Sequence, residues 1–353
     1  MILVTGGAGF IGANFIKEWL RHTSESLINL DKLTYAGNLA NLADCAEDPL
    51  YQFVQGDICN RELVREILEE SQPRALINFA AESHVDRSIH APENFIQTNI
   101  VGTYSLLEEA LIYWRELPPE KKEQFRFLHI STDEVYGALS AEDPPFTESS
   151  PYLPTNPYSA SKASGDHLVQ AYGKTYQLPV LITKSSNNFG PLQFPEKFIP
   201  HAILQALDGK PIHLYGDGLQ VRNWIYVLEH CQALRLVLEK GKKGDSYNIS
   251  SQTELTNLEL AQHICALLDE LLPNSVFCPH ASLIVHVADR PGHDRRYALN
   301  ASKALRELGW SSQGNFVEDL RTTVKWYLAH PEWIENILSG DYHNWVQKHY
   351  RGA

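Results

Sequence analysis

A hydroxyl and two adjacent carboxylates, Thr132, Asp133 and Glu134, follow an apolar run at residues 125–130. Such a run is typical of a buried parallel strand. Ligands of open α/β sheets bind just beyond the carboxyl ends of the strands, so we expect these side chains at the lip of a site. Because each carboxylate raises the cost of ionising the other, the pair could supply one acid and one base. A lone Asp-Glu pair is more often a solvated loop or a helix cap, so the interpretation depends on other motifs.

Tyr158 and Lys162 lie four residues apart and therefore share one face of a predicted helix. A phenol is a poor base at neutral pH unless a nearby cation stabilises its anion, and Lys162 is spaced to do this. With the Thr132 hydroxyl, Tyr158 could remove the proton of an alcohol while a cofactor accepts the hydride. Because helices contain many Y-x-x-x-K pairs, this motif too needs support.

The amino terminus supplies that support. The apolar run 2–4 leads into a loop containing Gly6, Gly9 and Gly12, and a helical pattern follows at 13–20. Such a loop lets the backbone bend tightly and approach a pyrophosphate, which the helix amino terminus attracts. A second apolar run, 27–30, ends in Asp31, near the offset expected for the acid that binds an adenosine ribose. A carboxylate there would repel a ribose phosphate, so the pattern predicts NAD rather than NADP. The alternative is a glycine-rich turn with an unrelated aspartate.

Strand and helix patterns then alternate along the chain. Strands are expected at 52–58 and 75–79, and helices at 61–70 and 95–113. This alternation predicts an α/β fold with a doubly wound, Rossmann-like parallel sheet and a smaller α+β carboxyl-terminal substrate domain. We expect the NAD-binding domain at 1–187, together with 223–249. The substrate domain is then expected at 188–222 and 250–353.

Polar residues at the predicted strand ends extend the site. Asp57 could reach the adenine amino group or cap a helix. Ala80 and Ala81 would let the cofactor lie close to the backbone, and Ser83 and His84 are near enough to the predicted crevice to contact substrate. These positions predict one crevice that holds cofactor and substrate together.

Composition excludes several classes of protein. The 353 residues suggest about two domains, and the net charge of -13 argues against nucleic-acid or anionic-membrane partners. The five cysteines are odd in number and contain no C-x-x-C pair, which argues against a disulfide framework and a structural zinc site. No signal peptide or membrane-length apolar run is evident. We therefore expect a cytoplasmic enzyme without a metal.

Motifs along nearly the whole chain resemble the extended short-chain dehydrogenase/reductase family, and within it the dTDP-glucose 4,6-dehydratases. They are T-G-G-A-G-F-I-G, D-K-L-T-Y-A-G-N, A-A-E-S-H-V-D-R-S-I, S-T-D-E-V-Y-G, P-Y-S-A-S-K-A, S-N-N-F-G-P, Q-F-P-E-K and D-R-P-G-H-D-R-R-Y. The most discriminating one contains Asp133 and Glu134, because epimerases of the same superfamily lack this pair. Other readings are a 4-epimerase, a dehydratase of a UDP, CDP or GDP sugar, and a non-catalytic NAD-sensing or scaffold protein.

The resemblance implies a reaction and a role for each catalytic residue. Tyr158, assisted by Lys162 and Thr132, would take the proton of the sugar 4-hydroxyl while carbon 4 gives its hydride to NAD. Glu134 would remove the carbon 5 proton, and Asp133 would protonate the departing 6-hydroxyl. Return of the hydride to carbon 6 turns dTDP-glucose into the 4-keto-6-deoxy sugar nucleotide, a deoxysugar precursor of the rhamnose type, and recycles a tightly held NAD. The resemblance also implies a homodimer that forms through a helix bundle.

The resemblance implies further binding residues. The cofactor contacts would be Gly6, Gly9, Phe10, Ile11, Gly12, Asp31, Lys32, Leu33, Thr34, Asp57, Ile58, Phe79, Ala80, Ala81, Ser83, Thr98, Tyr158, Lys162 and Asn188. The substrate contacts would be Ser83, His84, Thr132, Asn187, Lys197, Phe198, His213, Leu214, Tyr215, Arg222, Asn257, Asp289, Arg290 and His293. Considered without the resemblance, Arg222, Arg290, Arg295 and Arg296 would be expected to be surface ion-pair partners. Their placement in the predicted substrate domain reverses this expectation for Arg222 and Arg290 only.

The chain departs from the family pattern at three places. Asn223 replaces a usual aspartate, which could alter the orientation of Arg222, and Ser250-Ser251 replaces Gly-Gly, which could stiffen a turn. The run Leu228-Glu229-His230 is also unusual. A last feature is the aromatic carboxyl end, for which we expect core packing rather than carbohydrate stacking. Its members are Trp326, Tyr327, Trp333, Tyr342, Trp345 and Tyr350.

Overall fold

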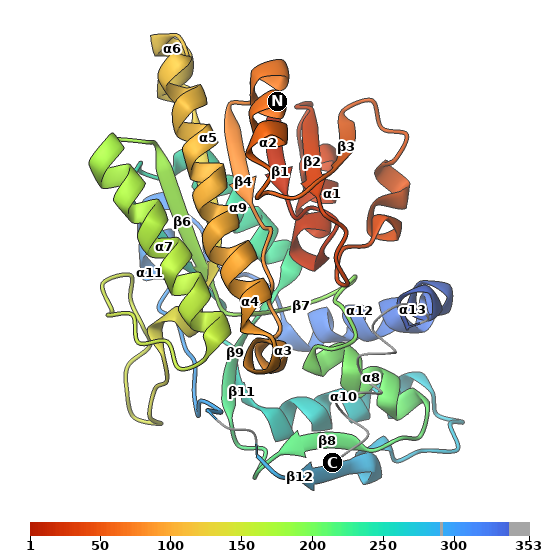
Figure 1. Cartoon of the computed structure of the whole chain (residues 1–353). Coiled ribbons are helices and arrows are strands. Elements are labelled where there is room, and N and C mark those ends of the chain that lie inside the picture. Colours follow the sequence, from red (N-terminus) through yellow and green to blue (C-terminus); the bar gives the residue numbers. More distant parts are fainter. Residues whose placement is uncertain (290–291, 339–353) are drawn as a thin grey trace.

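The computed structural model describes residues 1–289 and 292–338. Figure 1 shows a large sheet between helices in its upper part, and a smaller group of helices and short strands below. The large sheet is parallel, with the order β10-β6-β5-β4-β1-β2-β3. Its strands are β1 (Ile2–Thr5), β2 (Leu27–Asp31), β3 (Tyr51–Gln55), β4 (Ala75–Asn78), β5 (Arg126–Thr132), β6 (Val180–Ser185) and β10 (Ser246–Ile249). The predicted doubly wound sheet is confirmed.

Helices cover both faces of this sheet because successive strand residues point to opposite sides. Leu3 packs in the core beneath α2, α5 and α7, whereas Ile2 and Val4 pack in the core shared with α1 and α9. The helices of the two layers are α2 (Arg61–Ser71), α5 (Thr103–Glu116) and α7 (Pro157–Tyr176) on one face, and α1 (Phe10–His22), η1 (Leu39–Cys45) and α9 (Val227–Lys240) on the other.

The second, smaller part contains two short sheets, β11-β9-β7 and β12-β8. Their strands are β7 (Asn187–Phe189), β8 (Ile212–Tyr215), β9 (Val221–Tyr226), β11 (Glu254–Thr256) and β12 (Ile284–Val287). The helices beside them are α8 (Phe198–Leu207), α10 (Asn257–Leu271), η4 (His280–Leu283), α11 (Ser302–Leu308), α12 (Phe316–Ala329) and α13 (Pro331–Leu338). Because β9 pairs with β7 and β11, it belongs to this smaller part, while β10 returns to the large sheet.

The helix expected over 95–113 is interrupted. Residues 96–102 form a π-helical segment, η2 (Ile96–Gly102), before α5 begins. The Asn99 side chain accepts from the Glu82 amide at 2.9 Å and donates to the Glu82 carbonyl at 3.0 Å. Such π-helical turns are frequent at functional sites, and this one ties the strand-end loop after β4 to the helix layer. The other connecting helices are α3 (Val85–His90), α4 (Pro92–Phe95), α6 (Pro119–Gln124) and η3 (Asp133–Tyr136).

The aromatic residues near the carboxyl end pack against the rest of the fold. Tyr327 and Trp333 are buried, and the Trp333 ring nitrogen donates to Asn41 Oδ1 at 2.8 Å. The Trp326 ring stacks on His330 with ring centroids 4.4 Å apart. The packing prediction is confirmed for these three aromatics, whereas Tyr342, Trp345 and Tyr350 lie outside the described residues.

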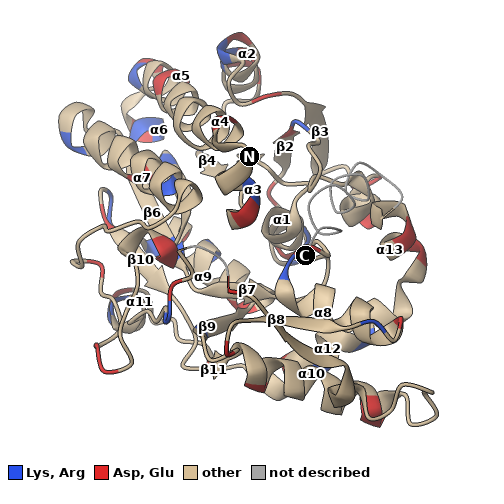
Figure 2. Cartoon of the chain, turned by 60° about the horizontal axis from the view of Figure 1, so that its bottom comes forward, with Lys and Arg blue, Asp and Glu red and all other residues tan. Residues whose placement is uncertain are grey.

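The surface carries charges of both signs. Figure 2 shows acidic and basic residues together along the helices that face the viewer. The chain has 43 acidic against 30 basic residues, a balance unlike that of a protein that binds along a polyanion. Within 1–289 and 292–338, no helix combines the length and apolarity needed to cross a membrane. The same residues contain no group of three or more His, Cys, Asp or Glu side chains suited to a metal ion.

Candidate active site

A cavity of about 300 Å³ lies at the carboxyl edge of the large sheet. It joins the glycine loop after β1 to the acid pair after β5, two strands away in the sheet. All five predicted catalytic residues line it: Thr132, Asp133, Glu134, Tyr158 and Lys162. Every predicted cofactor residue except Leu33 lines it as well, as do the predicted substrate residues Ser83, Asn187 and Lys197. The structure therefore brings together motifs that are up to about half the chain apart.

The glycine loop has the shape that a dinucleotide requires. Gly6 has a φ of +71°, and a β-carbon on Gly12 would lie 2.5 Å from the Gly6 carbonyl oxygen. The Asp31 carboxylate closes the loop, because it accepts from the amides of Ala8 at 2.9 Å and Leu33 at 2.8 Å. Burial raises the pKa of Asp31, and the two amide bonds act in the opposite direction. Backbone approach, helix terminus and buried carboxylate together fit NAD.

Asp57 has two contacts at the same end of the cavity. One carboxylate oxygen accepts from the Cys59 amide at 2.9 Å, and the other lies 2.6 Å from Lys32 Nζ. Asp57 therefore shapes the turn after β3 and holds Lys32 near the predicted adenosine site. The helix cap proposed as an alternative is supplied by Asn60, whose side chain accepts from Leu63.

The Thr132 hydroxyl connects the members of the acid pair. It donates to Asp133 Oδ1 at 3.2 Å and accepts from the Glu134 amide at 3.3 Å, so that η3 begins at the end of β5. Burial, followed by the Glu134 carboxylate, raises the pKa of Asp133 to about 7, while Thr132 and Arg222 act in the opposite direction. Asp133 can therefore carry a proton near neutral pH, as a general acid must.

A capping box fixes the start of the helix that carries Tyr158. The Asn156 side chain accepts from the Ser159 amide at 2.9 Å, and Pro157 occupies the first turn. Tyr158 then lies in the first turn of α7, and Lys162 one turn later donates from Nζ to the Ile130 carbonyl at 2.7 Å. Burial lowers the pKa of Lys162 to about 8, although Asp166 acts against this shift. Burial, followed by Glu134, raises the pKa of Tyr158 above its ordinary value, while Thr132 opposes this effect.

The sequence analysis assigned no role to Glu196, which lines the cavity, or to Tyr35 and Arg87, which lie beside Glu196. The Tyr35 hydroxyl donates to Glu196 Oε1 at 3.0 Å, and the Arg87 guanidinium lies 3.4 Å from the centre of the Tyr35 ring. Burial raises the pKa of Glu196 to about 7, although Lys197 and Arg87 favour its charged form. Glu196 belongs to the quoted Q-F-P-E-K motif, but its partners are remote in the sequence and no spacing signal links them. Lys197, which was predicted, donates to the Ser83 carbonyl at 2.7 Å.

The remaining predicted substrate residues lie outside the cavity lining. His84 caps α3, and Phe198 starts α8 and packs on the core. Most of the others gather around β8 in the smaller part. There, His293 Nδ1 lies 2.7 Å from Asp289 Oδ1, and the ring of His293 meets that of Tyr215 edge-on. The members of this group are His213, Leu214, Tyr215, Asn257, Asp289 and His293; Arg290 lies outside the described residues.

Arg222 lies between the two groups. Its guanidinium lies 4.5 Å from the centre of the Tyr297 ring and donates to the Asp294 carbonyl at 3.0 Å. It also lowers the pKa of Asp133. Arg222 therefore lies on β9 in the smaller part of the molecule and favours the charged form of Asp133.

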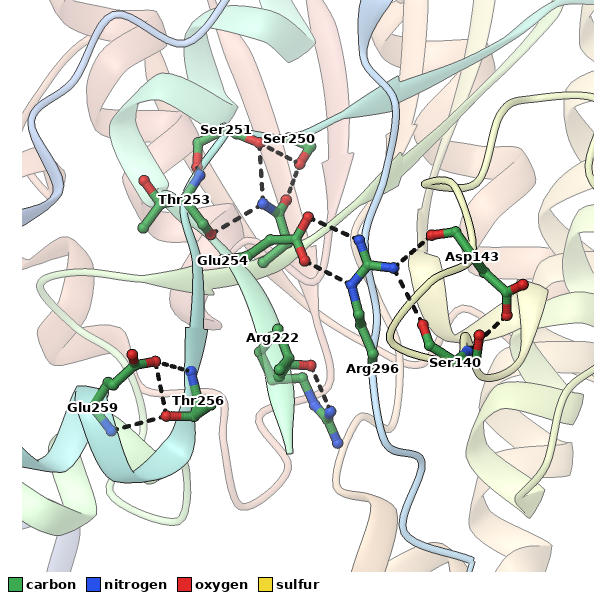
Figure 3. A network of polar contacts seen from close by, with 12 residues as sticks. Ser140, Asp143, Arg222, Ser250, Ser251, Thr253, Glu254, Thr256, Glu259 and Arg296 are labelled. Carbon is green, nitrogen blue, oxygen red and sulfur yellow. Dashed lines mark hydrogen bonds and ion pairs between the residues drawn. The ribbon is translucent and has the colours of Figure 1, made fainter. Parts of the chain in front are cut away.

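The Asn223 side chain bonds to the turn that contains the second departure from the family pattern. Its amide nitrogen donates to the carbonyls of Ser251 at 3.1 Å and Thr253 at 3.0 Å, and the Ser250 hydroxyl donates to its amide oxygen. The departures from the family pattern at 223 and at 250–251 therefore form one network in the turn between β10 and β11. Figure 3 shows Ser250, Ser251 and Thr253 of this turn.

Replacing Asn223 by aspartate should lower the stability of the protein. An aspartate cannot donate to the two carbonyls and would place a buried charge beside them, so we expect a loss of about 2 kcal/mol or more in the free energy of unfolding. Thermal melting would measure it. The control is Asn315→Asp, because Asn315 uses only its oxygen to cap α12 and aspartate caps equally well. Equal melting temperatures of the two variants would contradict the donor role of Asn223.

The chain is similar to known proteins over almost its whole length. A family model described as GDP-mannose 4,6 dehydratase matches residues 3–323. The dTDP-glucose 4,6-dehydratase of Salmonella typhimurium is 51% identical over 359 residues, which cover 99% of each chain. The chain belongs to the dTDP-glucose 4,6-dehydratase family. The solved structure of the family member from Streptomyces venezuelae, with NAD bound, has a TM-score of 0.86 and 43% identity and covers 95% of this chain and 99% of its own.

Epimerases share the fold of this dehydratase family at lower sequence identity. UDP-glucose 4-epimerase from Thermotoga maritima has a TM-score of 0.80 but 26% identity, with 93% of this chain and 98% of its own covered. The common fold therefore cannot decide the reaction, whereas sequence similarity and the Asp133-Glu134 pair both favour the dehydratases.

Proposed function

We propose that the protein is an NAD-dependent hydro-lyase that converts dTDP-glucose to dTDP-4-keto-6-deoxyglucose, for deoxysugar biosynthesis of the rhamnose type. The observation that carries this proposal is the cavity in which the acid pair, Tyr158 and the glycine loop meet. Oxidation of an alcohol needs the tyrosine and the cofactor site. Elimination of water needs, in addition, an acid and a base, and the two adjacent carboxylates supply them.

Each residue has a role that its surroundings support. Tyr158 takes the proton from the 4-hydroxyl, while Lys162 provides positive charge and Thr132 positions the hydroxyl groups. NAD, when bound, accepts the hydride from carbon 4 and returns it to carbon 6. Glu134 removes the carbon 5 proton, which the neighbouring ketone acidifies, and later returns it. Asp133 protonates the departing 6-hydroxyl, so that one water leaves and no net oxidation occurs.

The nucleotide diphosphate is assigned to the smaller part of the molecule. Lys197 lines the cavity, Arg222 packs on Tyr297 in the smaller part, and the group around β8 would hold the base. The domain division predicted from the sequence, with NAD binding at 1–187 and 223–249 and sugar-nucleotide binding at 188–222 and 250–353, remains a proposal. Its boundary at 222/223 falls within β9, which pairs with strands of the smaller part along its length. We also propose that the protein is located in the cytoplasm.

The direct test uses purified protein and dTDP-glucose without added NAD. We expect a product lighter by one water, with the alkali-sensitive absorbance of a 4-keto-6-deoxy sugar, because a recycled cofactor should be retained through purification. No product, even after NAD is added and other nucleotide glucoses and mannoses are tried, would contradict the proposal. A product of unchanged mass would instead indicate an epimerase.

The reaction should slow at alkaline pH because two groups, Asp133 and Lys162, lose the protons that their proposed roles require. Asp133 must be protonated to act as an acid, so the rate should fall as pH rises through about 7. Lys162 loses its charge above about 8 and should steepen the fall. A kcat profile measured from pH 5 to 9.5 tests this. In Asp133→Asn, the kcat of the residual activity should no longer fall near pH 7 and should fall only near pH 8. A profile unchanged from that of the wild type would contradict the assignment of Asp133 as the acid.

We propose that two chains associate through α5 and α7. Large apolar side chains are exposed on η2, α5 and α7, among them Ile96, Tyr104, Ile112 and Tyr176. Two such helices from each chain could form a two-fold bundle that covers these side chains. Sedimentation equilibrium of the wild-type protein should give a dimer, with twice the chain mass of 39.9 kDa. The double variant Tyr104→Glu/Ile112→Glu should give the monomer mass. A wild-type protein that has the monomer mass at micromolar concentration would contradict the proposed dimer.

A further inference from the structure

Residues 294–299, termed the strap here, connect the acid pair to the smaller part of the molecule. On one side the strap bonds to the segment that follows the acid pair: the Leu139 amide donates to the Arg296 carbonyl at 2.9 Å, and the Phe146 amide to the Ala298 carbonyl at 2.9 Å. On the other side it bonds to β9, where the Val221 amide donates to the Arg295 carbonyl at 2.8 Å. The strap therefore holds two distant segments in one register.

The Arg296 side chain reinforces this junction. Its Nε and Nη2 donate to the two carboxylate oxygens of Glu254, at 2.7 and 3.2 Å. Its Nη1 donates to the carbonyls of Asp143 at 2.7 Å and Ser140 at 3.3 Å. Figure 3 shows the guanidinium between Glu254 on one side and Ser140 and Asp143 on the other. The side chain is only 12% exposed, so this is not the surface ion pair that the sequence suggested.

These contacts use the particular geometry of arginine. Glu254 begins β11 and pairs across to Asn223 of β9, next to Arg222. A planar guanidinium can bind a carboxylate with two parallel bonds and still donate to carbonyls on its other edge, whereas a lysine cannot. One side chain thus joins the strap, the small sheet and the segment after the acid pair.

The strap also carries groups that are coupled to the acid pair. The Asp294 carbonyl and the Tyr297 ring hold Arg222, which lowers the pKa of Asp133. Burial, followed by the Glu134 carboxylate, raises the pKa of Tyr297. A shift of the strap would therefore move the surroundings of both carboxylates.

We propose that Arg296, paired with Glu254, is a positioning residue that fixes the acid pair relative to the substrate-binding part, and that the elimination step depends on it. The inference rests on the proposed function, because it assigns elimination to Asp133 and Glu134. Arg296 does not line the cavity, so its effect on the reaction is indirect, through the strap and the segments to which it bonds. Misplacement of catalytic groups by about 1 Å can slow a reaction about 100-fold.

The neighbouring Arg295 offers a matched control. It pairs with Asp217 at 2.8 Å, but both side chains are about half exposed, and such pairs contribute little. The variants are therefore Arg296→Lys, which keeps the charge and loses the fork, Glu254→Gln, which weakens the partner, and Arg295→Lys. Each is assayed for kcat, KM, retained NAD, melting temperature and the isotope effect of dTDP-glucose deuterated at carbon 5.

We expect Arg296→Lys to lower kcat about 10- to 100-fold with little change in KM or retained NAD, and to increase the carbon 5 isotope effect. Glu254→Gln should lower kcat in the same way but by a smaller factor. The double variant should lower kcat by less than the product of the two single factors. Arg295→Lys should match wild type. An Arg296→Lys protein as active as the Arg295→Lys control would overturn the proposal, as would a loss explained by the melting temperature with an unchanged isotope effect. Wild-type protein without dehydratase activity would instead refute the proposed function itself.

Discussion

Replacing Glu134 by glutamine is expected to lower the rate of dehydration by about 1,000-fold while oxidation at carbon 4 continues. The amide keeps the size of the side chain but cannot take the carbon 5 proton. The reaction should therefore stop after the first step, with the cofactor held in its reduced form. Mixing the variant with dTDP-glucose should produce absorbance at 340 nm without release of the dehydrated sugar.

The control for this experiment is Glu142→Gln. Glu142 follows the acid pair by eight residues and is exposed, so its loss removes a carboxylate from the same segment without touching the cavity. It should retain wild-type activity. Full activity of Glu134→Gln would exclude Glu134 as the base and leave Asp133 to serve both roles.

Asp133 and Glu134 have the same chemistry but different surroundings, which is why one can be assigned as acid and the other as base. Asp133 is nearly fully buried, and burial raises its pKa to about 7. Glu134 is only partly buried. The residue types alone left open which carboxylate holds the proton. The family resemblance implied Asp133, and the burial of Asp133 supports that assignment.

The parts of the site that could be predicted from the sequence are those formed by local motifs. The glycine loop, Asp31, the acid pair and the Tyr158 helix each follow a strand or begin a helix, so a few neighbouring residues specify their geometry. Because the carboxyl ends of parallel strands meet at one edge, predicting the sheet also predicts that these motifs meet.

Contacts between distant segments could not be predicted in this way. Tyr35 and Glu196 are 161 residues apart, and Arg296 lies 153 residues from its acceptor Asp143. Neither pair has a spacing signal, because such contacts depend on how the two parts of the molecule pack. The same limit applies to Asn223. In a strand, adjacent side chains point to opposite faces, and Asn223 bonds to the 250–253 turn, a contact that no spacing indicates.

Replacing Tyr158 by phenylalanine should stop the reaction at an earlier point. The hydroxyl that accepts the 4-hydroxyl proton is removed, so we expect kcat to fall about 1,000-fold or more. The fold should remain, because the Tyr158 ring packs edge-on against Phe95 with centroids 6.3 Å apart, and phenylalanine keeps that contact. Tyr176→Phe, at the exposed end of the same helix, is the control and should remain active.

The 340 nm signal separates Tyr158→Phe from Glu134→Gln. If Tyr158 takes the first proton, its variant should give no absorbance change with dTDP-glucose, although it retains NAD. Glu134→Gln should give the change and then stop. Because both variants lack product, a product assay alone would confuse them, whereas the reduced cofactor shows which step was lost. A Tyr158→Phe protein that still reduces the cofactor at the wild-type rate would show that another group in the cavity is the first base. The proposed role of Lys162, to stabilise the charge on Tyr158, would then lose its basis.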